Sequence, residues 1–229
     1  MDLNRVEPAV PLARIGRDRP LALSLASPGD TPWRQALEGF IARRFADTHG
    51  ARVRHFLPCL AGLRDAGGAV RGAAGLRAAQ ADRLFLERYL ERPVETALGE
   101  RLGQPVPREA IVEVGNLAAD GSVSARLLIV ALTDLLVGHG FRWVVFTGTP
   151  GLLNSFGRLG IELLPLGLAD PAKMGAELAD WGTYYASRPR VMAGDILRGH
   201  QRLLGTGAYP RLGYTPLYGD GGWPDVACG

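Results

Sequence analysis

Apolar and polar positions follow two different periods along this chain, and the changes of period mark the predicted elements. Residues 21–26 alternate in the manner of a half-buried strand and stop at a Ser-Pro-Gly turn. Thr31 is a plausible N-cap, with Pro32 at the first helical position. Apolar side chains then recur at helical spacing, which predicts one amphipathic helix ending near Gly50.

A hairpin is expected next. The apolar stretches 53–63 and 69–76 flank Asp65-Ala66-Gly67-Gly68, a turn rich in residues that tolerate positive φ. Pro58 cannot donate to a sheet ladder, so it indicates an edge or a bulge in the first of these strands.

The second half of the chain alternates helices with buried strands. A helical pattern spans 84–101, where Pro93 must open a new helix or kink the old one. Strands are predicted at 110–117, 143–146 and 162–168, separated by helices at 124–139 and 149–158.

This order of elements predicts an α/β protein with a mixed central sheet flanked by helices. A doubly wound fold has a similar order, but two early hairpin strands before the crossovers favour the mixed sheet. Beyond Leu204 the chain is rich in Gly and Pro and has little periodicity. We therefore expect one domain over 1–204 and an irregular tail over 205–229.

Four short strings carry a family resemblance. They are Gly75-Leu76-Arg77-Ala78, Leu84-Phe85-Leu86-Glu87-Arg88-Tyr89-Leu90, Ile111-Val112-Glu113-Val114-Gly115-Asn116-Leu117-Ala118 and Trp181-Gly182-x-Tyr184-Tyr185. In this order they resemble the thermostable haemolysin family. Together with the strand-turn-helix that follows the third string, they are also similar to the acyl-homoserine lactone synthases, relatives of the GNAT acyltransferases.

The resemblance implies a GNAT-like fold and an acyltransferase. The acyl group would come from a thioester on acyl-carrier-protein phosphopantetheine or on coenzyme A. That donor would act as co-substrate, with no tightly bound cofactor, and a small amine would be the acceptor. The segment 44–51 lacks the Trp with which the synthases bind S-adenosylmethionine, so lactone synthesis is not expected.

The same resemblance assigns the catalytic candidates. Arg77 and Glu113 stand where the synthases have a strand arginine and an acidic strand motif, and Glu113 is the candidate general base. The alternative is that Glu113 forms an ion pair with Arg77 that holds the sheet together. Asn116 is the third candidate, as a ligand for an amide or carbonyl group or simply as a cap of the strand end.

The donor site is expected along the third string, the turn after it and a later helix. Gly121, Ser122 and Ser124 could present backbone N–H groups to a phosphate with Arg126 nearby, although ordinary N-capping by Ser124 explains this loop equally well. Phe156 has no hydroxyl where GNAT enzymes often have a Tyr that protonates the leaving thiolate, so Ser155 or a water would remain. The full donor-binding set is Gly115, Leu117, Gly121, Ser124, Arg126, Ser155 and Phe156.

The composition of the chain bears on its binding partners and on the cellular compartment in which it is expected. The 229 residues are 47% hydrophobic, and 26 Lys+Arg against 23 Asp+Glu give a net charge of +3, a weak indication of an acidic partner such as a carrier protein. Two cysteines give no disulfide framework, the four histidines lack metal-ligand spacing, and no nucleic-acid motif is found. No uncharged apolar run reaches the roughly 18 residues that cross a bilayer, and no export signal is visible, so a cytoplasmic protein is expected.

Two other function classes stay open. The predicted helix at 32–48 carries arginines beside an aromatic face, a pattern that can lie on anionic lipid, so peripheral membrane contact or lysis is one alternative. A non-catalytic module that binds acyl thioesters or lipids is the other. The aromatic residues Trp181, Tyr184 and Tyr185 would line an acyl tunnel or support the core.

Overall fold

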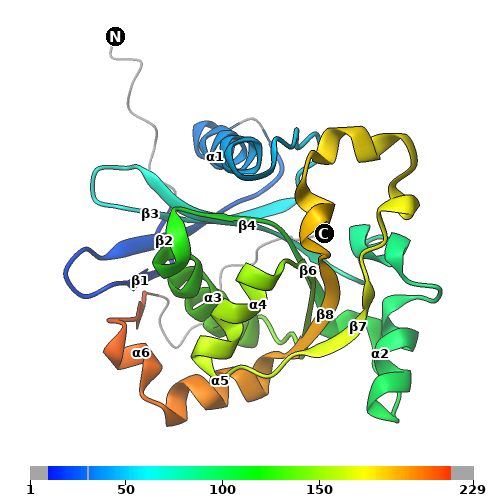
Figure 1. Cartoon of the computed structure of the whole chain (residues 1–229). Helices are drawn as coiled ribbons and strands as arrows, with labels where there is room; N and C mark the ends of the chain where they lie inside the picture. Colours follow the sequence, from blue (N-terminus) through cyan, green and yellow to red (C-terminus); the bar gives the residue numbers. More distant parts are fainter. Residues whose placement is uncertain (1–9, 30, 218–229) are drawn as a thin grey trace.

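The computed structural model describes residues 10–29 and 31–217. Within these residues, nine strands form one mixed sheet in the order β7-β8-β6-β5-β4-β3-β2-β1-β9 (Figure 1). Neighbouring strands are antiparallel except β5 and β6, which are parallel. The strands are β1 Ala13–Ile15, β2 Leu21–Ala26, β3 Cys59–Arg64, β4 Val70–Ala78, β5 Ile111–Ala119, β6 Trp143–Gly148, β7 Leu164–Leu168, β8 Arg190–Asp195 and β9 Thr215–Pro216.

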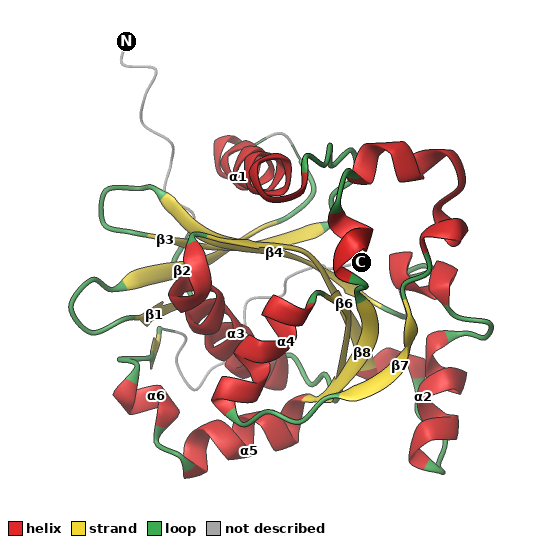
Figure 2. Cartoon of the chain, in the orientation of Figure 1, coloured by secondary structure: helices red, strands yellow, loops and turns green. Residues whose placement is uncertain are grey.

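Helices cover both faces of this sheet (Figure 2). α1 (Pro32–His49) lies on one face, and α3 (Gly121–Gly138), α4 (Pro150–Leu159) and α5 (Ile196–Gly205) lie on the other (Figure 1). The remaining helices are α2 Val94–Leu102, α6 Ala208–Arg211 and the 3-10 segments η1 Phe85–Tyr89, η2 Arg108–Ala110, η3 Pro171–Trp181 and η4 Tyr184–Ser187. The α/β class and the mixed, helix-flanked sheet are therefore confirmed.

The ends of α1 show why local signals were sufficient there. The Thr31 side chain accepts a hydrogen bond from the Arg34 backbone N–H, and Pro32 occupies the first turn. Gly50 ends the helix in the left-handed conformation at φ 63°, which a residue without a Cβ adopts freely. The side chains of Leu37 and Ile41 are fully buried beneath this helix.

Two predicted elements need correction, and a third is confirmed. Residues 53–58 are not part of a strand, and β3 begins only at Cys59, after Pro58. The helical pattern at 84–101 is confirmed as η1 and α2, and Pro93 opens a new helix, because α2 begins directly after it. The segment expected to be irregular from residue 205 contains α6 and β9, and β9 pairs with β1; its last residues, 218–229, lie outside the described part.

The feature that positions the site is the separation of β5 from β6. The two strands pair only from Ile111–Trp143 to Glu113–Val145. Beyond Glu113, β5 continues beside β4, while β6 continues beside β8. The sheet therefore opens between its two parallel strands, and backbone groups facing that opening lack a partner strand.

A bulge accompanies the opening. The register of β4 and β5 shifts between Ala73 and Gly75, and Asn116 on β5 adopts φ 50°. Asn is one of the few residues with a side chain that tolerates this left-handed conformation.

α3 is long and apolar enough to span a membrane by length and composition alone. In this fold it packs between the sheet and the helices α4 and α5, and Leu128 and Leu135 are among its fully buried side chains. The helix predicted at 124–139 is therefore confirmed, and it is a central helix covered on both sides.

Candidate active site

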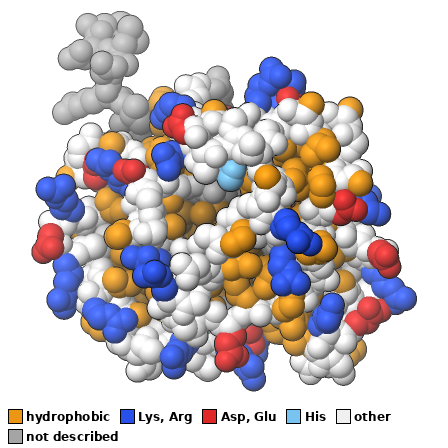
Figure 3. Space-filling view, in the orientation of Figure 1, with side chains coloured by type: hydrophobic (Ala, Val, Ile, Leu, Met, Phe, Trp, Pro, Cys, Tyr) orange, Lys and Arg blue, Asp and Glu red, His pale blue; other side chains and the backbone are white. Residues whose placement is uncertain are grey.

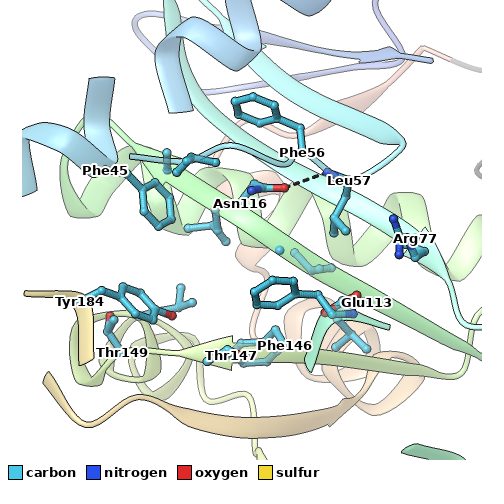
Figure 4. A pocket seen from close by; sticks show the side chains of 18 of the residues that line it. Phe45, Phe56, Leu57, Arg77, Glu113, Asn116, Phe146, Thr147, Thr149 and Tyr184 are labelled. Atoms are coloured by element: carbon cyan, nitrogen blue, oxygen red, sulfur yellow. Dashed lines mark hydrogen bonds between the residues drawn. The ribbon is translucent and has the colours of Figure 1, made fainter. Parts of the chain in front are cut away.

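A cavity of about 1260 Å³ follows the opening between β5 and β6. Its lining comes from both faces of the sheet, from α1, η1, η3 and η4 on one side and from α3 and α4 on the other. Figure 3 shows a hollow on the surface with hydrophobic side chains inside it and a histidine at its edge. Figure 4 shows side chains that line this cavity, including Glu113, Arg77, Asn116 and Tyr184.

Glu113 lies at the point where the two strands part, and it lines the cavity. The start of η1 fixes its carboxylate through two hydrogen bonds. Oε2 accepts a hydrogen bond from the Phe85 N–H at 2.9 Å, and Oε1 accepts one from the Leu86 N–H at 3.0 Å. The residue is only 3% exposed. Burial raises the pKa of this carboxyl, while the two N–H donors and the charge of Arg77 act in the opposite direction.

A carboxylate with a raised pKa in a cavity has the properties of a general base. Each oxygen also retains a second lone pair after accepting one backbone hydrogen bond. Either carboxylate oxygen can therefore still accept a hydrogen bond or a proton from a bound substrate or water.

Arg77 is the neighbour of Glu113 across the β4–β5 ladder, and it lines the same cavity. The ion pair between them, which was the alternative interpretation of Glu113, does not form. The Arg77 guanidinium instead donates to the Arg83 carbonyl at 3.1 Å and lies 3.8 Å from the exposed Asp82 carboxylate. Arg77 thus acts on Glu113 through its charge and not through a hydrogen bond.

Asn116 holds the loop that precedes β3. Its Oδ1 accepts from the Leu57 N–H at 2.9 Å, and its Nδ2 donates to the His55 carbonyl at 3.2 Å (Figure 4). Gly115 faces the same loop, because a Cβ there would come within 3.0 Å of the Leu57 side chain. Both residues line the cavity, and both also fix the loop that forms one of its walls.

The residues proposed to bind the donor divide into two groups. Leu117, Gly121, Ser155 and Phe156 line the cavity, whereas Ser124 and Arg126 are not among its lining residues. Ser122 lies at the start of α3 and does line it. Of the three turn residues expected to present backbone N–H groups to a phosphate, Gly121 and Ser122 therefore line the cavity, and Ser124 does not.

Arg44 is a lining residue that the sequence reasoning missed. It projects from α1, and its Nε donates to the Ala119 carbonyl at the end of β5, at 3.1 Å. This places a guanidinium near the turn between β5 and α3. No sequence motif marks it, because α1 and β5 are brought together only by the fold.

Phe156 packs in the core on the α3 side of the sheet. Its ring stacks on Phe146 with centroids 5.0 Å apart. The nearby Ser155 hydroxyl donates to the Gly151 carbonyl of its own helix at 3.3 Å. This part of the cavity is therefore mainly apolar.

A cluster of aromatic rings closes the cavity on the α1 side. Tyr184 from η4 has ring centroids at 5.2 Å from Trp181, 5.3 Å from His49 and 6.2 Å from Phe45. Burial lowers the pKa of His49 and so favours the neutral form of its ring. We call these four residues the aromatic roof. In the described part of the chain, no group of His, Cys, Asp and Glu is arranged to hold a metal ion.

Comparison with known proteins identifies the family. Residues 28–200 match the sequence model of the family described as thermostable hemolysin, so the chain belongs to that family. No protein with a curated description matches the chain.

Solved structures with the same fold include two whose names concern acyl transfer. FeeM, an N-acyl amino acid synthase from uncultured soil microbes, is 13% identical, with a TM-score of 0.55, over 81% of this chain and 97% of FeeM. BjaI, a CoA-dependent acyl-homoserine lactone synthase, is 17% identical, with a TM-score of 0.54, over 94% of this chain and 97% of BjaI. TofI is 19% identical, with a TM-score of 0.53, over 78% of this chain and 95% of TofI. At these identities the likeness establishes a shared fold.

Proposed function

We propose that this protein is an acyltransferase that moves an acyl group from a coenzyme A or carrier-protein thioester to a small amine. The observation that carries the proposal is the cavity along the opening between β5 and β6, with the buried Glu113 carboxylate at the point where the strands part. An extended thioester arm can lie in such an opening and bond to unpaired strand groups. The shared fold with CoA-dependent lactone synthases and an N-acyl amino acid synthase supports this class of donor.

In the proposed reaction, the amine attacks the thioester carbonyl carbon and Glu113 accepts the proton, directly or through a water. Arg77 keeps the carboxylate available, because its positive charge opposes the effect of burial on the pKa. Leu117, Gly121 and Ser122 lie on the donor side, and Arg44 is a candidate for contact with a phosphate. A cytoplasmic location agrees with a substrate pool of acyl thioesters and is part of the proposal.

Mass spectrometry tests the function. Purified protein is mixed with octanoyl-CoA or octanoyl-carrier protein and a panel of amines and amino acids, and N-acyl products are sought. We expect a product with the wild type and about 100-fold less with Glu113→Gln. Consumption of no thioester with any acceptor would contradict the proposal.

A non-catalytic thioester-binding module is the second candidate. It is favoured by the two backbone hydrogen bonds that occupy the Glu113 carboxylate. Binding of octanoyl-CoA without any product, unchanged in Glu113→Gln, would identify this module.

A further inference from the structure

The Tyr184 hydroxyl forms no hydrogen bond with the part of the chain that the structure describes. The residue is 8% exposed and lines the cavity. Among residues 10–29 and 31–217, none makes a hydrogen bond with its Oη. This oxygen is not among the fully enclosed polar atoms that lack a partner, so the hydroxyl is open to the cavity, where a ligand can accept its hydrogen bond.

The neighbouring tyrosines show the contrast. The hydroxyls of Tyr89 and Tyr185 lie 2.5 Å apart, and Tyr89 also donates to the Met174 sulfur at 3.2 Å. Both of these groups are satisfied inside the protein. Tyr184 lies against the Tyr185 ring at 5.2 Å but is left out of that pair.

The Tyr184 ring has a defined position. It packs on Phe45 of α1 and on His49, Trp181 and Tyr185, so it joins α1 to η4 across the aromatic roof. Figure 4 shows Tyr184 and Phe45 at one end of the cavity and Thr149, which follows β6, at the same end. A hydroxyl held this rigidly is pre-organised for a ligand in the opening.

From this geometry we infer that the Tyr184 hydroxyl donates a hydrogen bond to the carbonyl oxygen of the acyl thioester, and so stabilises the oxyanion that forms on attack. The inference rests on the proposed function and adds a catalytic residue to it. Burial raises the pKa of Tyr184 well above its ordinary value, so the phenol stays protonated and is a hydrogen-bond donor rather than an acid.

The step balances without loss of the Tyr184 proton. The amine nitrogen bonds to the carbonyl carbon, and the π pair moves to the oxygen that faces Tyr184. When the pair returns, the carbon–sulfur bond breaks and the thiolate leaves. The proton lost by the amine passes through Glu113 to the sulfur, which gives the free thiol and the N-acyl product.

Infrared difference spectroscopy with octanoyl-CoA, labelled with ¹³C at the thioester carbonyl, tests the contact without any acceptor. The carbonyl band should move to lower wavenumber on binding to the wild type, and Tyr184→Phe should lose most of that shift. Tyr185→Phe is the matched control, because its hydroxyl is paired with Tyr89, and it should keep the shift. An unchanged shift in Tyr184→Phe would overturn the inference while leaving the proposed function intact. A wild type that binds no octanoyl-CoA would overturn both.

Thermal unfolding without ligand supplies a second readout. Tyr184→Phe removes no internal hydrogen bond and should melt at or above the wild-type temperature, whereas Tyr185→Phe should melt lower. An equal loss in both variants would mean that the Tyr184 hydroxyl has an internal partner, which would also overturn the inference.

Discussion

At the residue scale, the chemistry depends on how burial changes Glu113. The sequence places a carboxylate on a central strand, and the fold removes it from water and gives it two N–H donors. Desolvation is the largest influence, so the pKa lies above its ordinary value of 4.5. A base is active only in its charged form, and this form is lost at a higher pH than for an exposed glutamate.

The pH dependence of turnover follows from this direction. As pH falls, the acyl-transfer rate should decline with an apparent pKa above 4.5, and Glu113→Gln should lack this limb and be about 100-fold slower near neutral pH. The check is a pH profile of product formation, with circular dichroism at each pH. Gln can accept from only one of the two N–H groups, so some loss of thermal stability is also expected. A wild-type profile that stays flat down to pH 4.5 would rule out Glu113 as the base.

Glu113 also makes the free energy of unfolding depend on pH, and here the dependence is the reverse of that of the rate: stability falls as pH rises. Its folded pKa is raised, so the proton is bound more tightly in the folded state than in the unfolded state. The stability that this group contributes is present below its unfolded pKa and is lost as pH rises through the folded value. A buried functional carboxylate therefore costs stability at neutral pH.

At the element scale, the roof of the cavity depends on close packing between η3–η4 and the end of α1. Thr183 donates its N–H to the His49 carbonyl at 2.8 Å, and Arg52 donates its N–H to the Asp180 carbonyl at 2.6 Å. Gly182 lies in this contact with φ 49°, and a Cβ there would be 2.1 Å from the His49 carbonyl oxygen. Only a glycine allows the two segments to approach this closely.

Gly175 and Gly182 have nearly the same backbone conformation but different surroundings, so replacing each by Ala distinguishes the cost of close packing from the cost of backbone strain. Gly175 has φ 54° and ψ −134°, close to φ 49° and ψ −123° at Gly182, but no atom lies within 4 Å of its added Cβ. Gly175→Ala should cost only the backbone strain, about 1 to 3 kcal/mol. Gly182→Ala should cost clearly more in denaturant unfolding and should also weaken binding of octanoyl-CoA. Equal losses in the two variants would show that the contact with α1 contributes nothing.

At the scale of the whole molecule, the question is which donor delivers the acyl group and whether the protein acts on membranes. The net charge is +3, and the basic side chains include Arg126 and Arg158, which lie outside the cavity lining. Such side chains suit the acidic surface of a carrier protein more than a buried phosphate. The aromatic face of α1 packs on the sheet, with Phe40 buried, so lipid insertion would require the helix to leave the core.

Salt dependence distinguishes the donors. Binding of octanoyl-carrier protein should weaken as ionic strength rises, and the double variant Arg126→Ala, Arg158→Ala should reduce it several-fold while leaving octanoyl-CoA binding unchanged. Titration calorimetry at low and high salt measures both. Carrier-protein binding that does not depend on salt would contradict a role for these arginines in binding the carrier protein.

Lysis of red cells tests the alternative class. Lysis by the protein alone, retained in Glu113→Gln, would contradict acyl transfer as the primary function.

The sequence by itself determined the elements whose signals are local. The strand at 21–26, the helix capped by Thr31 and Gly50 and the hairpin turn at 65–68 depend on neighbours along the chain, so pattern and cap residues were sufficient. The family strings also marked β5 and its Glu113. The segment 53–58 was misread because extended apolar residues have the same pattern whether or not they join a sheet.

Only the tertiary structure decided the composition of the site. The separation of β5 from β6, the placement of Arg44 beside Ala119 and the roof formed by Phe45 and Tyr184 join residues far apart in the chain. The tertiary structure also decided that Arg77 and Glu113 form no ion pair. The fold places the backbone N–H donors of η1 on Glu113, and the spacing of residues along the chain does not predict this contact. Periodicity records which side of an element is buried, whereas the partner that meets it is set by the packing of the whole chain.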